Sequence, residues 1–185
     1  MITVQVDTRE HKSEWERIQK QFDELGVKYF RSKLFCGDYQ SLDNARLVID
    51  RKKDLQEIHG NICQQHERFK SELLRAIDSG IKIVILCEHG EDVQSLEDVY
   101  FFYQPSMQRW KWETQKGPDG KAIVDAKGKP MKRRVPYTQN AIDGKKMYRS
   151  LCTIRDRYNV DFVFCTKEQT GAKIVEILSN DSRGD

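Results

Sequence analysis

Three charged residues follow directly on an apolar run near the middle of the first half of the chain. Residues 47–49 read Leu-Val-Ile, and Asp50, Arg51 and Lys52 come next. Because side chains alternate across a β-strand, we expect Asp50 and Lys52 to project from the same face. Asp38 lies in a Gly-Asp-Tyr sequence that a neighbouring strand could bring to that face. Two carboxylates can hold a divalent cation and a lysine can steady a water or a phosphate oxygen, as metal-assisted phosphodiester hydrolysis requires.

Charged residues at the end of a strand are more often solvated, or form exposed ion pairs of small energy. Here a further charged group, Asp7-Thr8-Arg9-Glu10, also follows an apolar run. Open sheets tend to place functional groups at such strand ends. The three groups together therefore favour a catalytic site over solvated charge.

Taken in order, these motifs resemble the XPF and Hef type nuclease domain, a branch of the PD-(D/E)XK nuclease superfamily. The family has an Asp-x-Arg-Glu block, a Gly-Asp-Tyr sequence, a Glu-Arg-Lys sequence, an Asp-Leu pair that opens a helix, and a later strand that ends in Glu. The matching residues here are Asp7, Arg9 and Glu10, then Gly37, Asp38 and Tyr39, then Asp50, Arg51 and Lys52, then Asp54 and Leu55, and finally Glu88. The resemblance covers about residues 2–104 and resumes near 145–179.

The resemblance implies a metal-dependent DNA endonuclease that hydrolyses phosphodiester bonds, with branched or flapped DNA as its substrate and Mg2+ or Mn2+ as its cofactor. Asp38 and Asp50 would bind the metal. Lys52 would orient the attacking water or stabilise developing negative charge. Because members of this family pair through their nuclease domains, homodimerisation is a further expectation.

The other motif residues have two alternative roles each. Asp7 and Glu10 would complete the acidic cluster as further catalytic residues, with Asp7 as a third metal ligand, or would hold a second metal through water. By the resemblance, Arg9 and Arg51 would contact phosphate or lock the carboxylates in place.

One departure from the family pattern affects the metal site. Asp50 stands where the family usually has Glu, and its side chain is shorter by one methylene group. A metal must then lie closer to the strand or be bound through water. A catalytically silent DNA-binding module on the same scaffold is therefore the alternative to an enzyme, although Asp7, Glu10, Asp38 and Lys52 are all kept. An RNA substrate is also left open.

Strands and helices alternate along the rest of the chain. Strands are predicted over residues 2–7, 27–34, 46–52, 81–87 and 160–165, and helices over 13–25, 55–79, 144–158 and after 166. The nearly continuous apolar run at 81–87 is typical of a strand covered on both faces. We predict an α/β fold with a restriction-endonuclease-like, three-layer α/β/α core, a central mixed sheet and a basic β-hairpin insertion.

Local signals predict where two of the helices begin, break and end. Ser13 with Glu16 has the pattern of a capping box, and Gly26 that of a helix stop. Gly60 is expected to interrupt the helix at 55–79, because glycine is unfavourable in a helix interior.

Composition is that of a single soluble domain, which by the resemblance would be one nuclease domain spanning residues 1–185. The chain is 38% hydrophobic and 33% charged, with a formal net charge of +3. No apolar run approaches the roughly 18 residues that span a bilayer, and the N-terminus does not have the regions of a signal peptide. A cytoplasmic protein without a membrane partner is expected. The five cysteines show no CxxC pair, so neither a zinc site nor a disulfide framework is predicted.

Residues 105–149 differ from the rest in charge. Twelve Lys or Arg stand against four acids, a net charge of +8, whereas the remainder carries −5. The alternation at 110–113 and the Gly-Pro-Asp-Gly sequence at 117–120 predict that 105–144 is a basic inserted hairpin. Aromatic rings flanked by cations can stack on unpaired bases and contact phosphates. The predicted nucleic-acid contacts are Trp110, Lys111, Trp112, Lys132, Arg133 and Arg134, together with Arg9. Alternatively, both tryptophans anchor the hairpin to the core.

Overall fold

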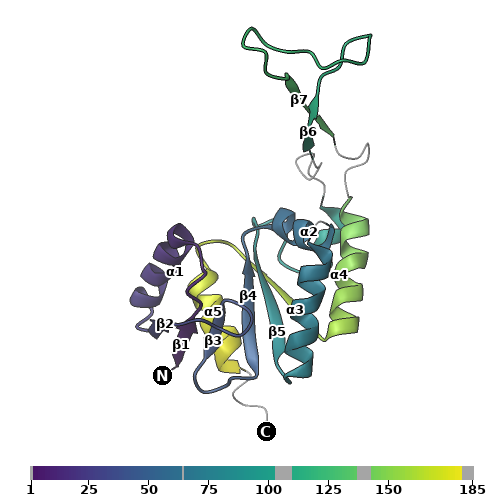
Figure 1. Ribbon diagram of the computed structural model, residues 1–185. Coiled ribbons are helices and arrows are strands. Elements are labelled where there is room, and N and C mark those ends of the chain that lie inside the picture. Colours follow the sequence, from purple (N-terminus) through teal and green to yellow (C-terminus); the bar gives the residue numbers. More distant parts are fainter. Residues whose placement is uncertain (1, 64, 103–109, 137–142, 181–185) are drawn as a thin grey trace. The chain divides into compact units, whose positions relative to one another are not determined.

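The computed structural model describes residues 2–63, 65–102, 110–136 and 143–180 (Figure 1). The chain divides into two compact units. The main unit comprises Met1–Phe102 and Gly144–Asp185, and the hairpin unit comprises Tyr103–Asp143.

The main unit is built on a six-stranded sheet with the order β2-β1-β3-β4-β5-β8. Its strands are β1 (Thr3–Val6), β2 (Lys28–Arg31), β3 (Tyr39–Ser41), β4 (Leu47–Lys52), β5 (Lys82–Glu88) and β8 (Asp161–Cys165). Strand β3 runs antiparallel to β1 and β4, and the other neighbours are parallel. The sheet is therefore mixed, as predicted. β5 lies between β4 and the edge strand β8 and is buried along nearly its whole length, which confirms that the apolar run is a strand covered on both faces.

Helices cover both faces of this sheet (Figure 1). They are α1 (Lys12–Glu24), α2 (Leu55–Cys63), α3 (His66–Asp78), α4 (Gly144–Tyr158) and α5 (Thr170–Asn180), with a short 3-10 turn η1 (Asp98–Phe101) before the hairpin unit. On one face, Phe22 of α1 and Ile174 of α5 pack with Ile49 of β4 in one hydrophobic cluster. Helices α2 and α3 contact β4 and β5, and α4 contacts α3 and η1. The predicted three-layer α/β/α fold is confirmed.

The first helix begins earlier than its sequence signals suggest. The capping box of Ser13 and Glu16 is wrong, because α1 starts at Lys12 with His11 as its N-cap residue. Ser13 lies inside the helix, and its Oγ is 2.9 Å from the His11 ring. At the other end Gly26 has φ +64°, and the Val27 N–H donates to the Phe22 carbonyl, as in a Schellman motif. The predicted helix stop is confirmed.

The segment 55–79 forms two helices rather than one interrupted at Gly60. Gly60 lies within α2, and the break falls between Cys63 and His66. The helix continues through Gly60 because other contacts stabilise α2. Asp54 Oδ1 accepts the Glu57 N–H at 2.7 Å at the start of the helix, and Ile58, one turn further on, is buried.

The described part of the hairpin unit is an antiparallel pair, β6 (Trp110–Thr114) and β7 (Lys132–Pro136). Beyond it, isolated bridges join Lys116 to Ala122 and Val124 to Pro130, and Gly120 and Gly128 adopt positive φ at the turns. The alternation at 110–113 thus corresponds to a strand.

None of the described helices is both long enough and apolar enough to cross a membrane. The cytoplasmic location stays a prediction.

Candidate active site

The charged side chains at the end of β4 lie on both faces of the sheet. Leu47, Ile49 and Arg51 point toward one face, so Asp50 and Lys52 point toward the other. Lys52 Nζ lies 2.8 Å from Asp50 Oδ1, and both side chains are largely shielded from solvent. The pairing of Asp50 with Lys52 on one face follows from the alternation described above.

Asp38 is brought to this pair by the turn between β2 and β3. Gly37 has φ +68°, and a Cβ there would lie 3.0 Å from the Ile49 carbonyl oxygen, so the close approach to β4 requires glycine. The Asp38 N–H donates to that carbonyl at 2.7 Å, and the Arg51 N–H donates to Asp38 Oδ2 at 2.8 Å. Two backbone hydrogen bonds therefore fix Asp38 against the end of β4.

The site has an excess of negative charge. Burial, with the neighbouring Asp50 and Glu10 carboxylates, raises the pKa of Asp38 well above its ordinary value. Burial alone would lower the pKa of Lys52, but attraction to Asp50, Asp38 and Glu57 outweighs it, so the pKa of Lys52 is raised. Lys52 is thus a cation at neutral pH, and the carboxylates around it still repel one another.

This donor set fits a hydrated divalent cation. Among residues 2–63, 65–102, 110–136 and 143–180, no group of three or more His, Cys, Asp or Glu side chains could hold a metal ion. Mg2+ is, however, commonly bound through one or two carboxylates, with water and substrate phosphate supplying the other oxygens. Asp38 and Asp50 provide such a pair, and a cation between them would relieve their repulsion.

Asp7 is held by hydrogen bonds from Arg9 and from the backbone, and its metal-binding role stays a prediction. It is fully buried, and its two oxygens accept hydrogen bonds from Arg9 Nε and Nη2 at 2.8 Å each. Asp7 Oδ2 also accepts the Leu34 N–H at 2.7 Å. Burial works against ionisation, yet these hydrogen bonds lower the pKa of Asp7 below its ordinary value. Asp7 is therefore an ionised anchor for Arg9 and for the backbone that precedes Gly37.

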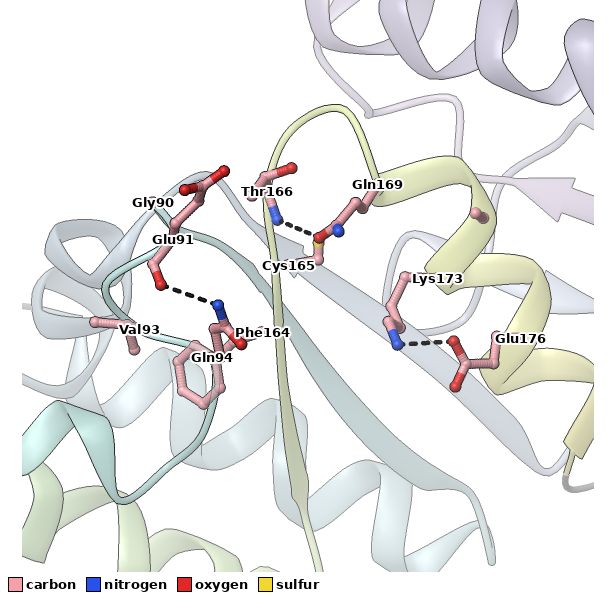
Figure 2. Close-up of a pocket in the computed structure, with 11 residues that line it drawn as sticks. Gly90, Glu91, Val93, Gln94, Phe164, Cys165, Thr166, Gln169, Lys173 and Glu176 are labelled. Atoms are coloured by element: carbon pink, nitrogen blue, oxygen red, sulfur yellow. Dashed lines mark hydrogen bonds and ion pairs between the residues drawn. The ribbon is translucent and has the colours of Figure 1, made fainter.

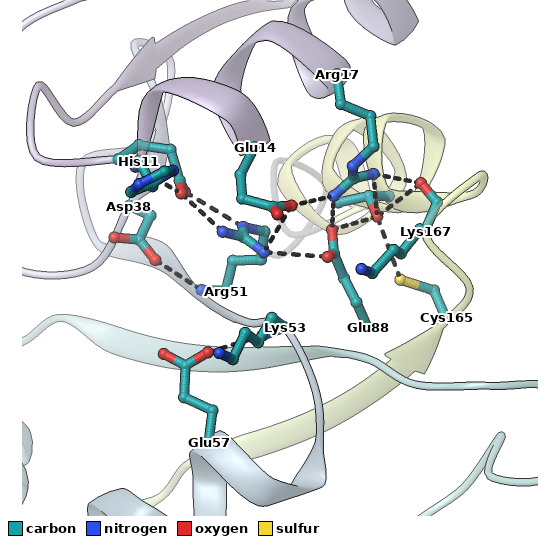
Figure 3. Close-up of polar contacts among 12 residues, drawn as sticks. His11, Glu14, Arg17, Asp38, Arg51, Lys53, Glu57, Glu88, Cys165 and Lys167 are labelled. Atoms are coloured by element: carbon teal, nitrogen blue, oxygen red, sulfur yellow. Dashed lines mark hydrogen bonds and ion pairs between the residues drawn. The ribbon is translucent and has the colours of Figure 1, made fainter.

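On the opposite face of β4, Arg51 lies in a buried ion network (Figure 3). Its Nη2 is 2.7 Å from Glu10 Oε1, and its Nη1 is 3.0 Å from Glu88 Oε2. The Tyr39 hydroxyl donates to Glu10 Oε2 at 3.0 Å. Burial lowers the pKa of Arg51, but these carboxylates more than compensate and raise it, so Arg51 stays charged. Of the two roles implied for Arg51, its contacts are those of a lock on carboxylates.

The network includes residues that sequence reasoning missed. Arg17 contacts Glu88, and its Nη2 lies 3.1 Å from Glu14 Oε2 (Figure 3). The Thr170 hydroxyl, at the start of α5, donates to Glu88 Oε1 at 2.6 Å. The i,i+3 spacing of Glu14 and Arg17 was the available signal. Their link to Glu88 depends on how α1 and α5 pack, which that spacing does not show.

A pocket of about 490 Å³ lies elsewhere in the main unit (Figure 2). It is lined by the segment after β5, the end of β8 and α5. Its polar groups largely satisfy one another: Gln94 Nε2 donates to the Glu91 carbonyl, Gln169 Oε1 accepts the Thr166 N–H, and Lys173 pairs with Glu176. The lining residues do not include Asp38, Asp50 or Lys52, so this pocket is separate from the candidate active site.

The residues predicted to bind nucleic acid in the hairpin unit lie on both faces of one ribbon. Trp112 is opposite Arg134, and Glu113 is opposite Arg133. Trp112 is 69% exposed, and its alternative role as an anchor to the core stays a prediction. Lys111 Nζ and Arg133 Nη2 lie 3.6 and 3.8 Å from the Glu113 carboxylate. Lys132 ends the ladder, and the side chain of Trp110 lies outside the described residues.

Comparison with known protein families places the chain in one class. The ERCC4 domain family matches residues 6–178, almost the whole chain. The chain therefore belongs to the ERCC4 domain family, and the resemblance to the XPF and Hef type nuclease domain is confirmed. Comparison with curated proteins gives no match.

Two solved structures are similar in fold. One, described as XPF from Aeropyrum pernix, has a TM-score of 0.57 and 16% sequence identity over 98% of this chain. The other, XPF from Aeropyrum pernix in complex with DNA, has a TM-score of 0.57 and 14% identity over 100% of this chain. The chain spans 65% and 68% of the length of those two chains. At this identity the similarity shows a shared fold.

Proposed function

We propose that this protein is a metal-dependent endonuclease that hydrolyses phosphodiester bonds in DNA. The observation that carries the proposal is the convergence of Asp38, Asp50 and Lys52 at the end of β4. Two carboxylates that repel each other, with a cation 2.8 Å from one of them, form a site suited to a divalent metal and a phosphate.

Each residue of the site has a distinct task. Asp38 and Asp50 would hold Mg2+ or Mn2+, which when bound polarises the scissile phosphate and lowers the pKa of the attacking water. Lys52, charged and facing the same side, orients that water or stabilises charge that develops on the phosphate. Arg51 keeps the end of β4 in place from the other face through Glu10 and Glu88, and so acts as a positioning residue.

The substrate class is part of the proposal. The hairpin unit has nine Lys or Arg against four acids, a net charge of +5, whereas the rest of the chain carries −2. Its exposed Trp112 offers a ring on which an unpaired base can stack. One structure of similar fold is described as a complex with DNA. These features support DNA with single-stranded character, such as branched or flapped molecules. Homodimerisation stays a prediction.

Incubation of the purified protein with flapped, forked and four-way-junction DNA tests this function. Cleavage is expected with Mn2+ or Mg2+, and it should be lost with a chelator or in Asp38→Asn. The matched control is Asp78→Asn, which removes an exposed carboxylate at the end of α3, next to the start of β5 and away from the ends of β4 and β5. Cutting by Asp38→Asn at the wild-type rate would overturn the proposal.

A catalytically silent DNA-binding module is the second candidate, and the presence of Asp50 instead of the family's Glu favours it. It predicts that the wild-type protein binds branched DNA without cutting it, and that Asp38→Asn binds with unaltered affinity. Replacing the DNA with RNA of the same sequence and branching tests the remaining substrate class.

A further inference from the structure

The segment that joins β2 to the Gly37 turn presents an aromatic side chain immediately before the candidate active site. Its side chains alternate: Leu34 and Cys36 are buried, whereas Arg31, Lys33 and Phe35 are exposed. Phe35 is 63% exposed. Since Phe35 precedes Asp38 by three residues, their Cα atoms are at most about 11 Å apart.

This segment is held by hydrogen bonds at its start and in its middle. The Ser32 N–H donates to the Val6 carbonyl at 3.0 Å, and the Leu34 N–H donates to Asp7 Oδ2 at 2.7 Å. Arg9 Nη2 donates to the Leu34 carbonyl at 3.3 Å. The Phe35 ring is thus presented to solvent from a fixed backbone, where exposed apolar area is unfavourable until a ligand covers it.

Three cationic side chains lie within four residues of Phe35 in the sequence or hydrogen-bond to its neighbour Leu34, and Asp7 pairs with one of them, Arg9. The Arg9 side chain is 56% exposed, although it is bound to Asp7 and Leu34. Arg31 donates to the carbonyl oxygens of Thr8 and Glu10 and lies over the Trp15 ring, and Lys33 is exposed. On the other side Glu72 supplies one acid, 3.5 Å from the Gly37 nitrogen. An exposed ring among cations, next to metal-binding carboxylates, is suited to a nucleotide that offers both a π-face and phosphates.

We propose that Phe35 stacks on an unpaired base of the DNA next to the scissile phosphate, while Arg9 and Lys33 contact the adjoining phosphates. The inference rests on the proposed nuclease function and adds a substrate requirement to it: the nucleotide beside the cut is unpaired or becomes unpaired. Phe35 is a DNA-contact residue, and Asp7 is the positioning residue that holds its backbone.

Photocrosslinking of a flapped DNA tests the contact directly. Single 5-iododeoxyuridines are placed in turn at the nucleotides around the branch point and irradiated with the Asp38→Asn protein, which keeps the DNA intact. Peptide mass spectrometry is expected to find an adduct at residue 35. The adduct should be absent in Asp38→Asn with Phe35→Ala and retained with Phe35→Trp. A fully paired duplex should give little adduct.

Binding and cleavage provide the second readout. In the otherwise wild-type protein, Phe35→Ala should weaken binding of the flapped DNA roughly 5- to 150-fold, the range for loss of one base–aromatic stack. Phe35→Trp should restore it. The control is Leu42→Ala, because Leu42 is 57% exposed but follows the end of β3 opposite to Asp38, where its N–H donates to the Thr3 carbonyl. Both alanine variants should keep the wild-type melting temperature.

The outcomes separate this inference from the proposed function. If the wild-type protein cuts but shows no adduct at residue 35, and Phe35→Ala cuts as fast, the inference is overturned and the nuclease remains. If an adduct forms but no DNA is cut, the contact stands and the nuclease proposal fails. If Phe35→Ala instead changes the oligomeric state in sedimentation and leaves DNA binding intact, a second copy of the chain covers this ring, and the inference is overturned.

Discussion

Arg51 and Asp38 are joined by a backbone hydrogen bond that connects the two faces of β4. The Arg51 N–H donates to Asp38 Oδ2 at 2.8 Å, while the Arg51 guanidinium lies on the opposite face between Glu10 and Glu88. A change in the buried ion network should therefore move the carboxylate that is proposed to bind metal, although none of the network side chains lies with Asp50 and Lys52.

Replacement of Arg51 by Met should destabilise the protein strongly. It would leave the carboxylates of Glu10 and Glu88 buried without their main cation, and removal of one partner from a buried pair costs about 3–5 kcal/mol. Urea denaturation measures the loss. Arg155→Met is the control, since Arg155 is exposed and pairs with its exposed neighbour Asp156, so a change within about 0.5 kcal/mol is expected. A loss under about 1 kcal/mol for Arg51→Met would show that the network contributes little to stability.

Replacement of Asp38 by Asn should stabilise the metal-free protein while it abolishes cleavage. Burial and the repulsion by Asp50 and Glu10 raise the pKa of Asp38 in the folded state. The folded state therefore holds the proton more tightly than the unfolded one, so between the ordinary carboxyl pKa and the raised value, stability falls as pH rises.

Thermal unfolding with a chelator, measured from pH 4 to pH 8, checks this prediction. In Asp38→Asn the melting temperature should fall less steeply as pH rises, and at pH 7 it should be higher than that of the wild type. For a domain of this size, each 1 kcal/mol of added stability raises the melting temperature by about 2–4 °C. Addition of Mn2+ should raise the melting temperature of the wild type and not that of the variant. Identical pH profiles for the two proteins would contradict the proposed repulsion.

Asp7→Asn separates a positioning role of Asp7 from the metal-binding role suggested by the family resemblance. The lowered pKa of Asp7 means that its ionised form stabilises the fold above the ordinary carboxyl pKa, and this stability is lost as pH falls through the lowered value. The variant should lose that acid dependence, and the Leu34 amide should exchange its hydrogen faster. The Mn2+-induced rise in melting temperature should persist. Its disappearance would assign Asp7 to the metal.

Trp112 and the cations of the neighbouring strand β7 should contribute to DNA affinity without contributing to stability. Trp112→Ala is expected to weaken binding of single-stranded DNA at least 5-fold, with an unchanged melting temperature, because one stacked base is worth about 1–3 kcal/mol.

The paired change Lys132→Gln with Arg133→Gln tests the electrostatic part of this binding. It should lower the slope of log affinity against log salt by about 1.4 on single-stranded DNA, since each phosphate contact contributes about 0.7. Lys20→Gln, at an exposed position of helix α1, should leave the slope unchanged. A wild-type slope in the paired variant would mean that these two side chains do not contact phosphate.

Much of the architecture could be read from local patterns. Alternation placed Asp50 and Lys52 on one face of β4, because side-chain direction in a strand depends only on residue parity. The apolar run at 81–87 indicated a strand covered on both faces, and Gly26 ended α1 as predicted. Local signals were less dependable at Ser13 and Gly60, where packing of the buried residues on α1 and α2 decided the helix limits.

The sequence by itself therefore identified the charged motifs, whereas only the tertiary structure decided which partner each charged side chain contacts. Asp7, Glu10 and Glu88 look alike as acids at strand ends. Their partners depend on the order β1-β3-β4-β5 and on the placement of α1 and α5 over one face. That order turns Asp7 to Arg9 and Leu34, and Glu10 and Glu88 to Arg51, which leaves Asp38 and Asp50 with Lys52. The reason is physical: strand parity is a local property, but the partner of a buried charge is set by contacts between residues far apart in the chain.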